Sequence, residues 1–375
     1  MMKFENPIKK FFTKKDDSVL GVDIGPSYIK VVQLKRKHGK AILETYGALA
    51  LGPYAGIEIG KATALPPEKL SEALIDLMRE ANVTSRNCGV SIPMSSSLVT
   101  NIEVPHVEAK QMAQIIPIEA RKYIPVPITE VLLDWWEIPR EESSPNEFEM
   151  DEKEEKKKSE KSEVLLVVIH NDALARMQEV IKLSELEATF YEIEIFSTIR
   201  SVMDREGTPI MIFDLGASST KLYIVDKGIL RTSHIINRGS QDLTMAISKS
   251  MSISTEEAEN LKRSTGFTPV AEGTDIISVV SSTLSFIFSE AERVLLNYQK
   301  KYLKNIGKIV LTGGGVGLKG FKEIAQETFG VNVVFADPFA KVESPAFLEG
   351  VLKQVGPEFA VSVGLALRKL QENDK

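Results

Sequence analysis

Short runs of β-branched and aliphatic residues recur along the whole chain, and most are bounded by glycine, proline or polar residues. Runs of this length and composition are typical of strands that are buried on at least one face. Residues 19–22 and 29–34 flank a tight turn and predict a β-hairpin, and residues 209–215 and 221–225 predict a second one. Further strands are predicted at residues 41–50, 88–93, 98–104, 131–138, 164–170, 188–193, 308–312 and 331–335.

Apolar residues spaced three and four apart predict helices between these strands. The helix that Pro66 and Pro67 open carries Leu70, Leu74 and Leu77 on one face. Helices are also predicted at residues 108–123, 173–186, 194–203, 240–251, 255–265, 275–303, from 318, and 359–370. The longest of these could form a coiled coil, but the repeat is short and a core-facing side is favoured. Since strands and helices alternate in two successive sets, the sequence predicts an α/β protein with two lobes.

One segment departs from this alternation. Residues 140–163 are almost all charged or polar and offer very little apolar surface to bury. Such a composition predicts disorder. A solvated loop that joins two strands is favoured over an interaction tail.

The composition is ordinary for a soluble globular protein of 375 residues, with 43% hydrophobic and 26% charged residues. The net charge of -6 excludes a surface that is basic throughout, so no nucleic-acid partner is expected. No stretch is apolar enough to span a bilayer, which takes about 20 residues. The basic and aromatic residues 1–17 are interpreted as a lead-in that packs on the body, in preference to a membrane-touching helix. The only cysteine, Cys88, excludes internal disulfides and is interpreted as a packing residue.

The strongest chemical signal is a turn that occurs twice, at residues 23–30 and 214–221. Both copies read Asp-x-Gly-x-Ser-x-x-Lys, and both follow an apolar strand and lead into another one. A glycine turn between two strands can present backbone N–H groups to a phosphate. One copy alone would be an ordinary hairpin, but two matching copies favour a pair of turns that clamp a triphosphate between lobes.

The side chains of the repeated turn suit the same ligand. Ser27, Ser218 and Thr220 add hydroxyl donors, and Lys30 can reach phosphate oxygens as a point charge. The aspartate at each strand end can hold Mg²⁺ through water, since Mg²⁺ keeps most of its hydration.

Two further motifs could bind the rest of a nucleotide. Residues 311–320 predict a strand end, a glycine-rich turn and a helix start, where a sugar can lie against bare backbone. Glu259 and Lys262 lie three residues apart on a predicted helix and therefore share a face. They could bracket a ribose or an adenine edge, although spacing alone favours a solvated salt bridge. The histidine spacing and the lack of a Gly-x-Ser-x-Gly elbow leave zinc and triad chemistry unsupported.

The order of these motifs resembles that of the actin-like ATPases: two phosphate hairpins, a Glu-x-x-Lys helix and a Thr-Gly-Gly-Gly adenosine turn. Within that superfamily, residues 239–262 and 309–321 resemble both the FtsA and the PilM families. Residues 120–135, 336–344 and 359–370 resemble the PilM family of type IV pilus assembly proteins in particular. FtsA-like proteins end in an amphipathic membrane-targeting helix. The sequence here ends in a short polar stretch, residues 370–375, which favours the PilM family.

The resemblance implies an actin-like fold of two lobes, that is, duplicated ribonuclease-H-like domains with an FtsA-type inserted subdomain. It implies a first lobe at residues 18–97 that is completed by 187–206 and 357–375, an insertion at 98–186, and a second lobe at 207–356.

The resemblance also implies a function. ATP and Mg²⁺ are the implied cofactors, and the implied location is the cytoplasm, beneath the inner membrane. The implied partner is the N-terminal tail of the membrane protein PilN, gripped in a groove between the first lobe and the insertion. Other inner-membrane and motor components of the pilus are implied as further partners of this nucleotide-responsive scaffold.

Specific residues match the family motifs position by position. The first phosphate turn, the second phosphate turn, the adenosine-edge pair and the adenosine turn match at Asp23, Gly25, Ser27, Lys30, Asp214, Gly216, Ser218, Thr220, Glu259, Lys262, Gly313, Gly314 and Gly315. Asp23 and Asp214 are the implied metal-facing carboxylates. Glu194 matches the residue that positions attacking water in filament-forming relatives, and Asp214 is the second catalytic candidate.

Three positions depart from the family pattern. Pro26 stands where a serine or threonine is usual, which removes one N–H and one hydroxyl from the turn. Ala217 and Ile195 also replace the usual residues. These departures argue against fast ATP hydrolysis more than they argue against ATP binding. Three alternatives stay open: a small-molecule kinase of the same fold, an FtsA-like membrane filament protein, and a partner-binding module with a degenerate nucleotide site.

Overall fold

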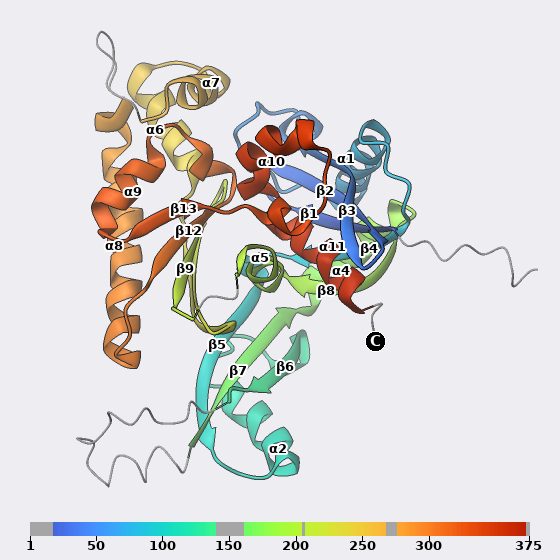
Figure 1. Ribbon diagram of the computed structural model, residues 1–375, viewed down its shortest axis with the longest axis vertical. Helices are drawn as coiled ribbons and strands as arrows, with labels where there is room; N and C mark the ends of the chain where they lie inside the picture. The colour runs from blue at the N-terminus through green and yellow to red at the C-terminus, as the bar shows by residue number, and fades with distance from the viewer. Residues whose placement is uncertain (1–17, 140–160, 205–206, 268–275, 373–375) are drawn as a thin grey trace, which may run out of the picture.

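The computed structural model describes residues 18–139, 161–204, 207–267 and 276–372. Figure 1 shows two lobes side by side and a smaller subdomain that projects away from them. The expected lead-in at residues 1–17 and most of the expected charged loop, residues 140–160, lie outside the described residues.

The first lobe is built on a sheet with the strand order β3-β2-β1-β4-β8. Its strands are β1 (Ser18–Ile24), β2 (Tyr28–Lys37), β3 (Lys40–Ala50), β4 (Asn87–Ile92) and β8 (Glu187–Ile193). The first three form an antiparallel meander, and β4 and β8 continue the sheet in parallel. Cys88 is fully buried in this sheet, where burial raises the pKa of its thiol to about 12, in keeping with a packing residue.

The second lobe repeats this topology. Its sheet has the order β11-β10-β9-β12-β13, again a meander followed by two parallel strands. The strands are β9 (Ile210–Leu215), β10 (Thr220–Asp226), β11 (Ile229–Ile236), β12 (Lys308–Thr312) and β13 (Asn332–Phe335). The predicted α/β architecture of two lobes is confirmed, and β11 is a strand that the sequence pattern did not predict.

Helices α6 (Ser240–Met251), α7 (Thr255–Thr265), α8 (Ile276–Tyr302) and α9 (Phe321–Phe329) belong to the second lobe. The apolar stripe of α8 packs into the lobe's core, which favours the core-facing interpretation over a coiled coil. Although α8 is long, neither it nor another described helix is apolar enough over a sufficient length to cross a membrane.

The projecting subdomain consists of β5 (Ser97–Pro105), α2 (Ala109–Ala120), β6 (Val131–Glu137) and β7 (Lys161–His170). Its sheet has the order β5-β7-β6 and is antiparallel throughout. A separate small core joins this sheet to α2, with Ile102, Met112 and Val164 among its buried side chains. The subdomain therefore has its own core and leaves β6 as an edge strand.

Two expected boundaries of this insertion are corrected by the structure. Residues 161–163 are not part of a disordered loop, because they begin β7, where Ser162 is buried and Glu163 forms an ion pair with Arg231. The expected insertion at 98–186 is also too long. Helix α4 (Asn171–Leu183) packs beside α1 (Pro67–Glu80), and its buried side chains join the core of the first lobe.

Helices α5 (Glu194–Val202) and α11 (Ala360–Glu372) complete the first lobe from distant parts of the chain, and the short helix α10 (Glu349–Val355) precedes α11. α11 lies so close to β1 that a side chain at Gly21 would overlap the Ser362 carbonyl. It lies equally close to α5, where a side chain at Gly364 would overlap Ser197. Glycine at these two positions permits the close packing of strand and helices.

A charge cluster joins the same elements. Glu192 at the end of β8 accepts two hydrogen bonds from the Arg200 guanidinium, at 2.7 and 2.8 Å. Arg368 of α11 donates to the same carboxylate at 2.7 Å, and the Ser197 hydroxyl donates at 2.5 Å. Such bidentate, charge-assisted bonds are among the stronger polar contacts in proteins.

Replacing Glu192 by Gln should lower the free energy of unfolding by about 2 to 3 kcal/mol, since two arginines then lose their carboxylate partner. Burial raises the pKa of Glu192, but Arg200 and Arg368 outweigh burial and hold that pKa below its ordinary value. This stabilisation is therefore present above the ordinary glutamate pKa and is lost as the pH falls through the lowered value. Urea unfolding at about pH 7 and about pH 3 measures both effects. Equal free energies of unfolding for Glu192→Gln and for the exposed control Glu80→Gln at neutral pH would contradict the prediction.

Candidate functional site

A cavity of about 730 Å³ lies between the two lobes, where β1 and β9 end. It brings together the residues that the sequence assigns to the nucleotide site, with one exception. Those in the lining are Asp23, Gly25, Ser27, Lys30, Glu194, Asp214, Gly216, Ser218, Glu259, Lys262, Gly313, Gly314 and Gly315. The exception is Thr220, which is fully buried outside the cavity lining and donates its hydroxyl to the Arg238 carbonyl at 2.8 Å. Its position does not support the expected phosphate contact.

The two hairpin turns have the same local geometry. In the first, the Gly25 N–H donates to the Tyr28 carbonyl at 2.9 Å. In the second, the Gly216 N–H donates to the Ser219 carbonyl at 3.0 Å. Because these glycine N–H groups close the turns, any amides offered to a phosphate belong to the turn residues that follow them.

Three carboxylates and a lysine meet on the floor of the cavity. Lys221 Nζ lies 2.6 Å from Glu194 Oε2 and 3.4 Å from Asp214 Oδ2. Asp23 is close enough to act on Glu194 electrostatically, and it accepts a hydrogen bond from the Ser91 hydroxyl at 2.8 Å. Glu194 belongs to the first lobe and Lys221 to the second, so this ion pair joins the lobes.

The protonation of this cluster follows from burial and proximity. Burial raises the pKa of Glu194 above its ordinary value, Lys221 opposes the rise, and the charges of Asp214 and Asp23 add to it. Burial lowers the pKa of Lys221, but Glu194 and Asp214 outweigh burial and leave that pKa above its ordinary value. Lys221 is therefore an ammonium at neutral pH, surrounded by carboxylates.

The sequence assigns a phosphate contact to Lys30 and no role to Lys221, yet the two lysines occupy the same position of the repeated turn. Each is the cross-strand neighbour of its aspartate, Asp23 or Asp214. Lys30 lines the cavity, and within the part of the chain that the structure describes its side chain forms no hydrogen bond or ion pair. The repeated motif is the sequence signal that points to Lys221, but only the fold shows its partners.

Glu259 and Lys262 of α7 form a buried ion pair, with 2.7 Å between Oε2 and Nζ. The Thr244 hydroxyl donates to Glu259 at 2.7 Å, and Lys262 donates to the Ser240 carbonyl at 3.2 Å. The prediction from spacing alone, a solvated salt bridge, is therefore wrong. The pair is a fixed, polar part of the cavity wall.

The glycine-rich turn after β12 approaches the end of β9 very closely. Gly313 has a φ of 88°, and a side chain there would overlap the Asp214 carboxylate. Its N–H donates to the Pro357 carbonyl at 2.8 Å, which ties the turn to the segment before α11. A side chain at Gly315 would overlap Leu215. Bare backbone therefore forms this wall of the cavity.

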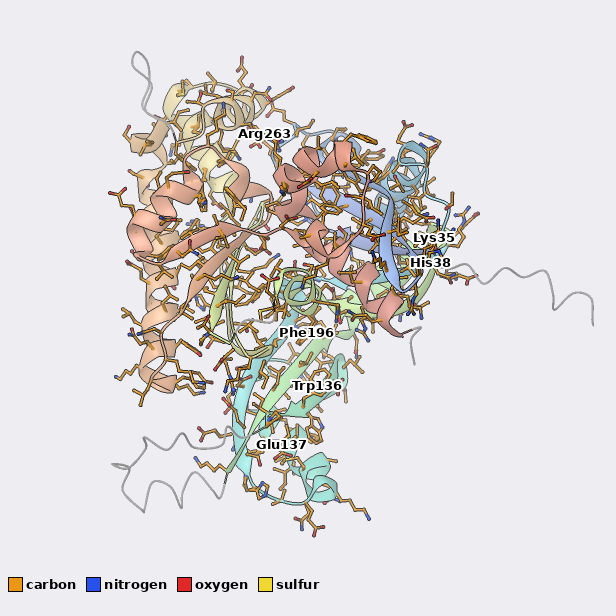
Figure 2. All side chains as sticks on the ribbon, in the orientation of Figure 1. Lys35, His38, Trp136, Glu137, Phe196 and Arg263 are labelled. Atoms are coloured by element: carbon orange, nitrogen blue, oxygen red, sulfur yellow. The ribbon has the colours of Figure 1, made fainter. Side chains whose placement is uncertain are left out.

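The mouth of the cavity is bridged by contacts between the lobes. Arg263 of α7, labelled in Figure 2, donates to the Tyr28 hydroxyl at 3.2 Å. The Ala62 N–H of the first lobe donates to the side-chain oxygen of Gln241 in α6 at 2.9 Å. These two contacts join the lobes beside the site.

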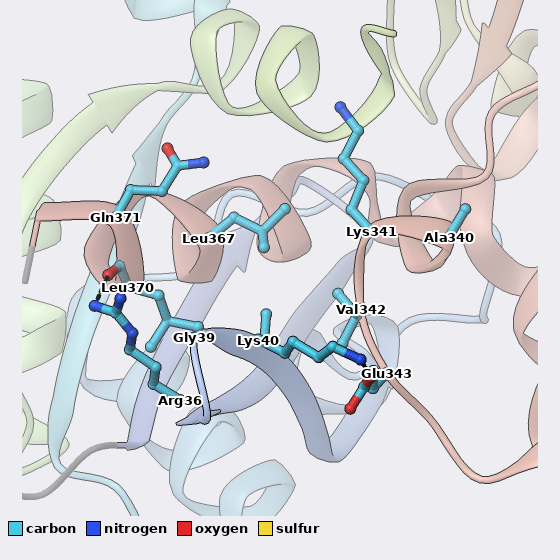
Figure 3. Close-up of a pocket in the computed structure, with 11 residues that line it drawn as sticks. Arg36, Gly39, Lys40, Ala340, Lys341, Val342, Glu343, Leu367, Leu370 and Gln371 are labelled. Atoms are coloured by element: carbon cyan, nitrogen blue, oxygen red, sulfur yellow. Dashed lines mark hydrogen bonds and ion pairs between the residues drawn. The ribbon is translucent and has the colours of Figure 1, made fainter. Parts of the chain in front are cut away.

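A second cavity, of about 420 Å³, lies between the β2–β3 hairpin and α11 (Figure 3). Its cationic side chains already have partners: Lys40 pairs with Glu343, Lys341 donates to backbone carbonyls, and Arg36 donates to the Leu370 carbonyl. None of the phosphate-turn, Glu-x-x-Lys or glycine-turn residues lines it, so the cavity between the lobes is the candidate site.

Replacing Gly313 by Ala should destabilise the protein by about 2 kcal/mol or more, because the new methyl group meets Asp214 at a backbone angle that favours glycine. Gly314→Ala is the matched control, since a methyl group there makes only ordinary contacts with Glu358. Urea unfolding curves of both variants measure the difference. Equal midpoints for the two variants would contradict this account of the turn.

Comparison with known proteins places these features in a family. The family model described as type IV pilus assembly protein PilM matches residues 21–370. The cell division protein FtsA of Bacillus subtilis (strain 168) is 26% identical over an alignment of 168 residues, which covers 40% of this chain and 38% of FtsA. FtsA of Streptococcus pneumoniae serotype 2 is 30% identical over 155 residues, 36% of this chain and 34% of that protein. The chain thus matches well under half the length of these two curated relatives.

Solved structures share the fold over nearly the whole chain. A chain of the PilM-PilN type IV pilus biogenesis complex superposes with a TM-score of 0.77 at 24% identity, covering 94% of this chain and 98% of that one. The ethanolamine utilization protein EutJ from Carboxydothermus hydrogenoformans gives 0.54 at 14% identity, covering 93% of this chain and 89% of that one. MreB 5 of Spiroplasma citri superposes with a TM-score of 0.50 at 11% identity, covering 96% of this chain and 98% of that one. The fold is therefore the expected actin-like fold. Because the matching model spans almost every described residue, the chain belongs to the family of type IV pilus assembly protein PilM.

Proposed function

We propose that this protein is an ATP-binding scaffold of type IV pilus assembly that holds the cytoplasmic N-terminal tail of the membrane protein PilN. Membership of the family supports the role in pilus assembly. The partner is suggested by the PilM-PilN complex, whose chain has the same fold. In this proposal the protein works in the cytoplasm, is attached to the inner membrane through PilN, and connects it to other inner-membrane and motor components.

The nucleotide part of the proposal rests on one observation: motifs from four separate segments line a single cavity between the lobes. In this proposal the turn amides and the Ser218 hydroxyl face a phosphate chain, and Lys30 supplies an uncommitted positive charge for it. The Ser27 hydroxyl already donates to the Lys61 carbonyl at 3.2 Å, so its side chain is not part of the proposed phosphate contact. The bare backbone at Gly313, Gly314 and Gly315 offers a flat wall for the adenosine. Lys262 and Glu259 form the polar edge beside it.

A metal ion fits this site less well than the nucleotide does. The described residues contain no group of three or more His, Cys, Asp or Glu side chains that could hold a metal. Glu194 and Asp214 face Lys221 instead. Mg²⁺ held directly by the protein therefore does not fit, and the water-mediated contact predicted for Asp23 and Asp214 stays a prediction.

Slow hydrolysis at most is proposed, with Glu194 and Asp214 as the residues that could orient a water molecule. One oxygen of Glu194 accepts the Met94 N–H at 2.6 Å and the other accepts from Lys221 at 2.6 Å. A carboxylate that is bonded on both oxygens is a weak base for water. Binding that closes the lobes, more than turnover, would then carry the signal to a partner.

Lys30→Met should weaken ATP binding about tenfold or more, since one charge-assisted contact to a phosphate is lost. Lys35→Met is the matched control: Lys35 lies on the same strand, outside the cavity lining, and pairs with Glu44 at 3.7 Å. Equilibrium titration of a fluorescent ATP analogue into the full chain measures both. The nucleotide proposal fails if the wild type shows no saturable binding, or if both lysine variants bind as the wild type does.

The proposed tail-binding surface lies where the inserted subdomain meets the first lobe. Strand β6 is an edge strand, and its Leu132 and Trp136 are each about half exposed on one face. The Trp136 ring lies 6.1 Å from the Phe196 ring of α5. Both residues are labelled in Figure 2. An exposed strand edge with an aromatic side chain can add a peptide strand and anchor one of its side chains.

Trp136→Ala should weaken binding of a peptide with the cytoplasmic N-terminal sequence of the cognate PilN by about tenfold or more, as expected when an aromatic anchor is lost. Phe347→Ala removes another exposed aromatic side chain, away from β6, and should leave the affinity unchanged. Isothermal titration with and without ATP measures the affinities. Equal affinities of the wild type and Trp136→Ala for the peptide would show that the tail binds another surface.

A further inference from the structure

The two copies of the phosphate turn have different electrostatic roles. Lys30 and Lys221 occupy the same position of the repeat, each opposite an aspartate across the hairpin. Lys30 lines the cavity and, among the described residues, has no ion-pair partner. The Lys221 side chain is only 15% exposed and lies against two carboxylates. The duplication has therefore produced one lysine that can serve a ligand and one that serves the protein.

The carboxylates around Lys221 need a cation. Asp23, Glu194 and Asp214 come from three different elements and converge at the cavity, where Glu194 and Asp214 are buried and Asp23 is half-buried. Like charges placed this close repel each other strongly when little water screens them. In the usual metal-dependent nucleotide site a hydrated divalent ion satisfies such carboxylates. Here the ammonium of Lys221 lies between Glu194 and Asp214 and faces the oxygens that such an ion would need.

We propose that Lys221 is a built-in cation of the nucleotide site, which takes the place of a divalent ion between Glu194 and Asp214. The protein alone then has little affinity for divalent metals, and its affinity for ATP depends only weakly on Mg²⁺. This inference rests on the proposed nucleotide binding for its second part but not for its first. Since the ion pair joins α5 to β10, it also closes the lobes without a metal.

Metal binding by the full chain without nucleotide tests the first part. Mn²⁺ is the probe, because free and bound Mn²⁺ are distinguished by electron paramagnetic resonance. At free Mn²⁺ concentrations below about 1 mM, we expect the wild type to bind no Mn²⁺ at the carboxylate cluster. Lys221→Ser should bind Mn²⁺ there at least about tenfold more tightly. Lys30→Ser, the equivalent change in the other turn, should bind Mn²⁺ as the wild type does. Adding Asp214→Asn to Lys221→Ser should abolish the gain.

Removing Lys221 leaves buried carboxylates without a partner, so Lys221→Ser can fold poorly. Lys221→Arg keeps the charge, and we expect it to bind Mn²⁺ as weakly as the wild type. The wild-type titration is decisive by itself. If the wild type binds one Mn²⁺ per chain tightly and Asp214→Asn abolishes that binding, a metal displaces Lys221 and the inference is overturned.

ATP affinity measured with Mg²⁺ and with excess chelator tests the second part. For the wild type we expect dissociation constants within about threefold of each other, and for Lys221→Ser a loss of at least about tenfold in chelator. A wild type that binds ATP only with Mg²⁺ overturns this part. If no nucleotide binds under either condition, the proposed function fails, while the Mn²⁺ titration still decides whether Lys221 replaces the metal.

Discussion

The close approach of α11 to β1 and α5 is the constraint on which the site depends. It requires Gly21 and Gly364, because side chains there would overlap backbone atoms of the facing helix. By packing against both elements, α11 fixes the end of β1, which carries Asp23, relative to the start of α5, which carries Glu194. The segment before α11 also accepts the Gly313 N–H from the second lobe. One helix thus positions the carboxylates of the first lobe and the glycine-rich turn of the second.

Duplication explains the shape of the site, and divergence explains its chemistry. The two sheets share one topology, and their hairpin turns are closed by equivalent hydrogen bonds. The second turn, however, faces Glu194 of α5 in the other lobe. A lysine in that place forms an ion pair, whereas the lysine of the first turn remains available to a ligand. A symmetric scaffold therefore holds an asymmetric distribution of charge.

Much of the fold could be predicted from the sequence because its strands and helices bury periodic apolar faces. The predicted bounds of α6, α7 and β12 agree with the structure. Strand β11 was missed because its residues, Ile-Leu-Arg-Thr-Ser-His-Ile-Ile, do not form a continuous apolar run. Most of the site residues could be found because the motif repeats. The burial of the Glu259–Lys262 pair could not be predicted, because the spacing on α7 carries no information about the loop that places Gly60 against Glu259. The role of Lys221 depends on Glu194 in the other lobe, which no local pattern contains.

The inserted subdomain contacts both lobes, and this links the proposed nucleotide site to the proposed partner surface. On one side the Asn101 amide donates to backbone carbonyls of β11, and the Ser233 hydroxyl donates to the Val99 carbonyl. On the other side the Trp136 ring of β6 lies against Phe196, two residues after Glu194 on α5. A change in lobe closure that moves α5 relative to β11 must alter at least one of these contacts, because the subdomain cannot follow both. ATP and a peptide on β6 would then favour or oppose the same conformation, and each ligand's difference in affinity between the closed and open states would limit the coupling free energy between them.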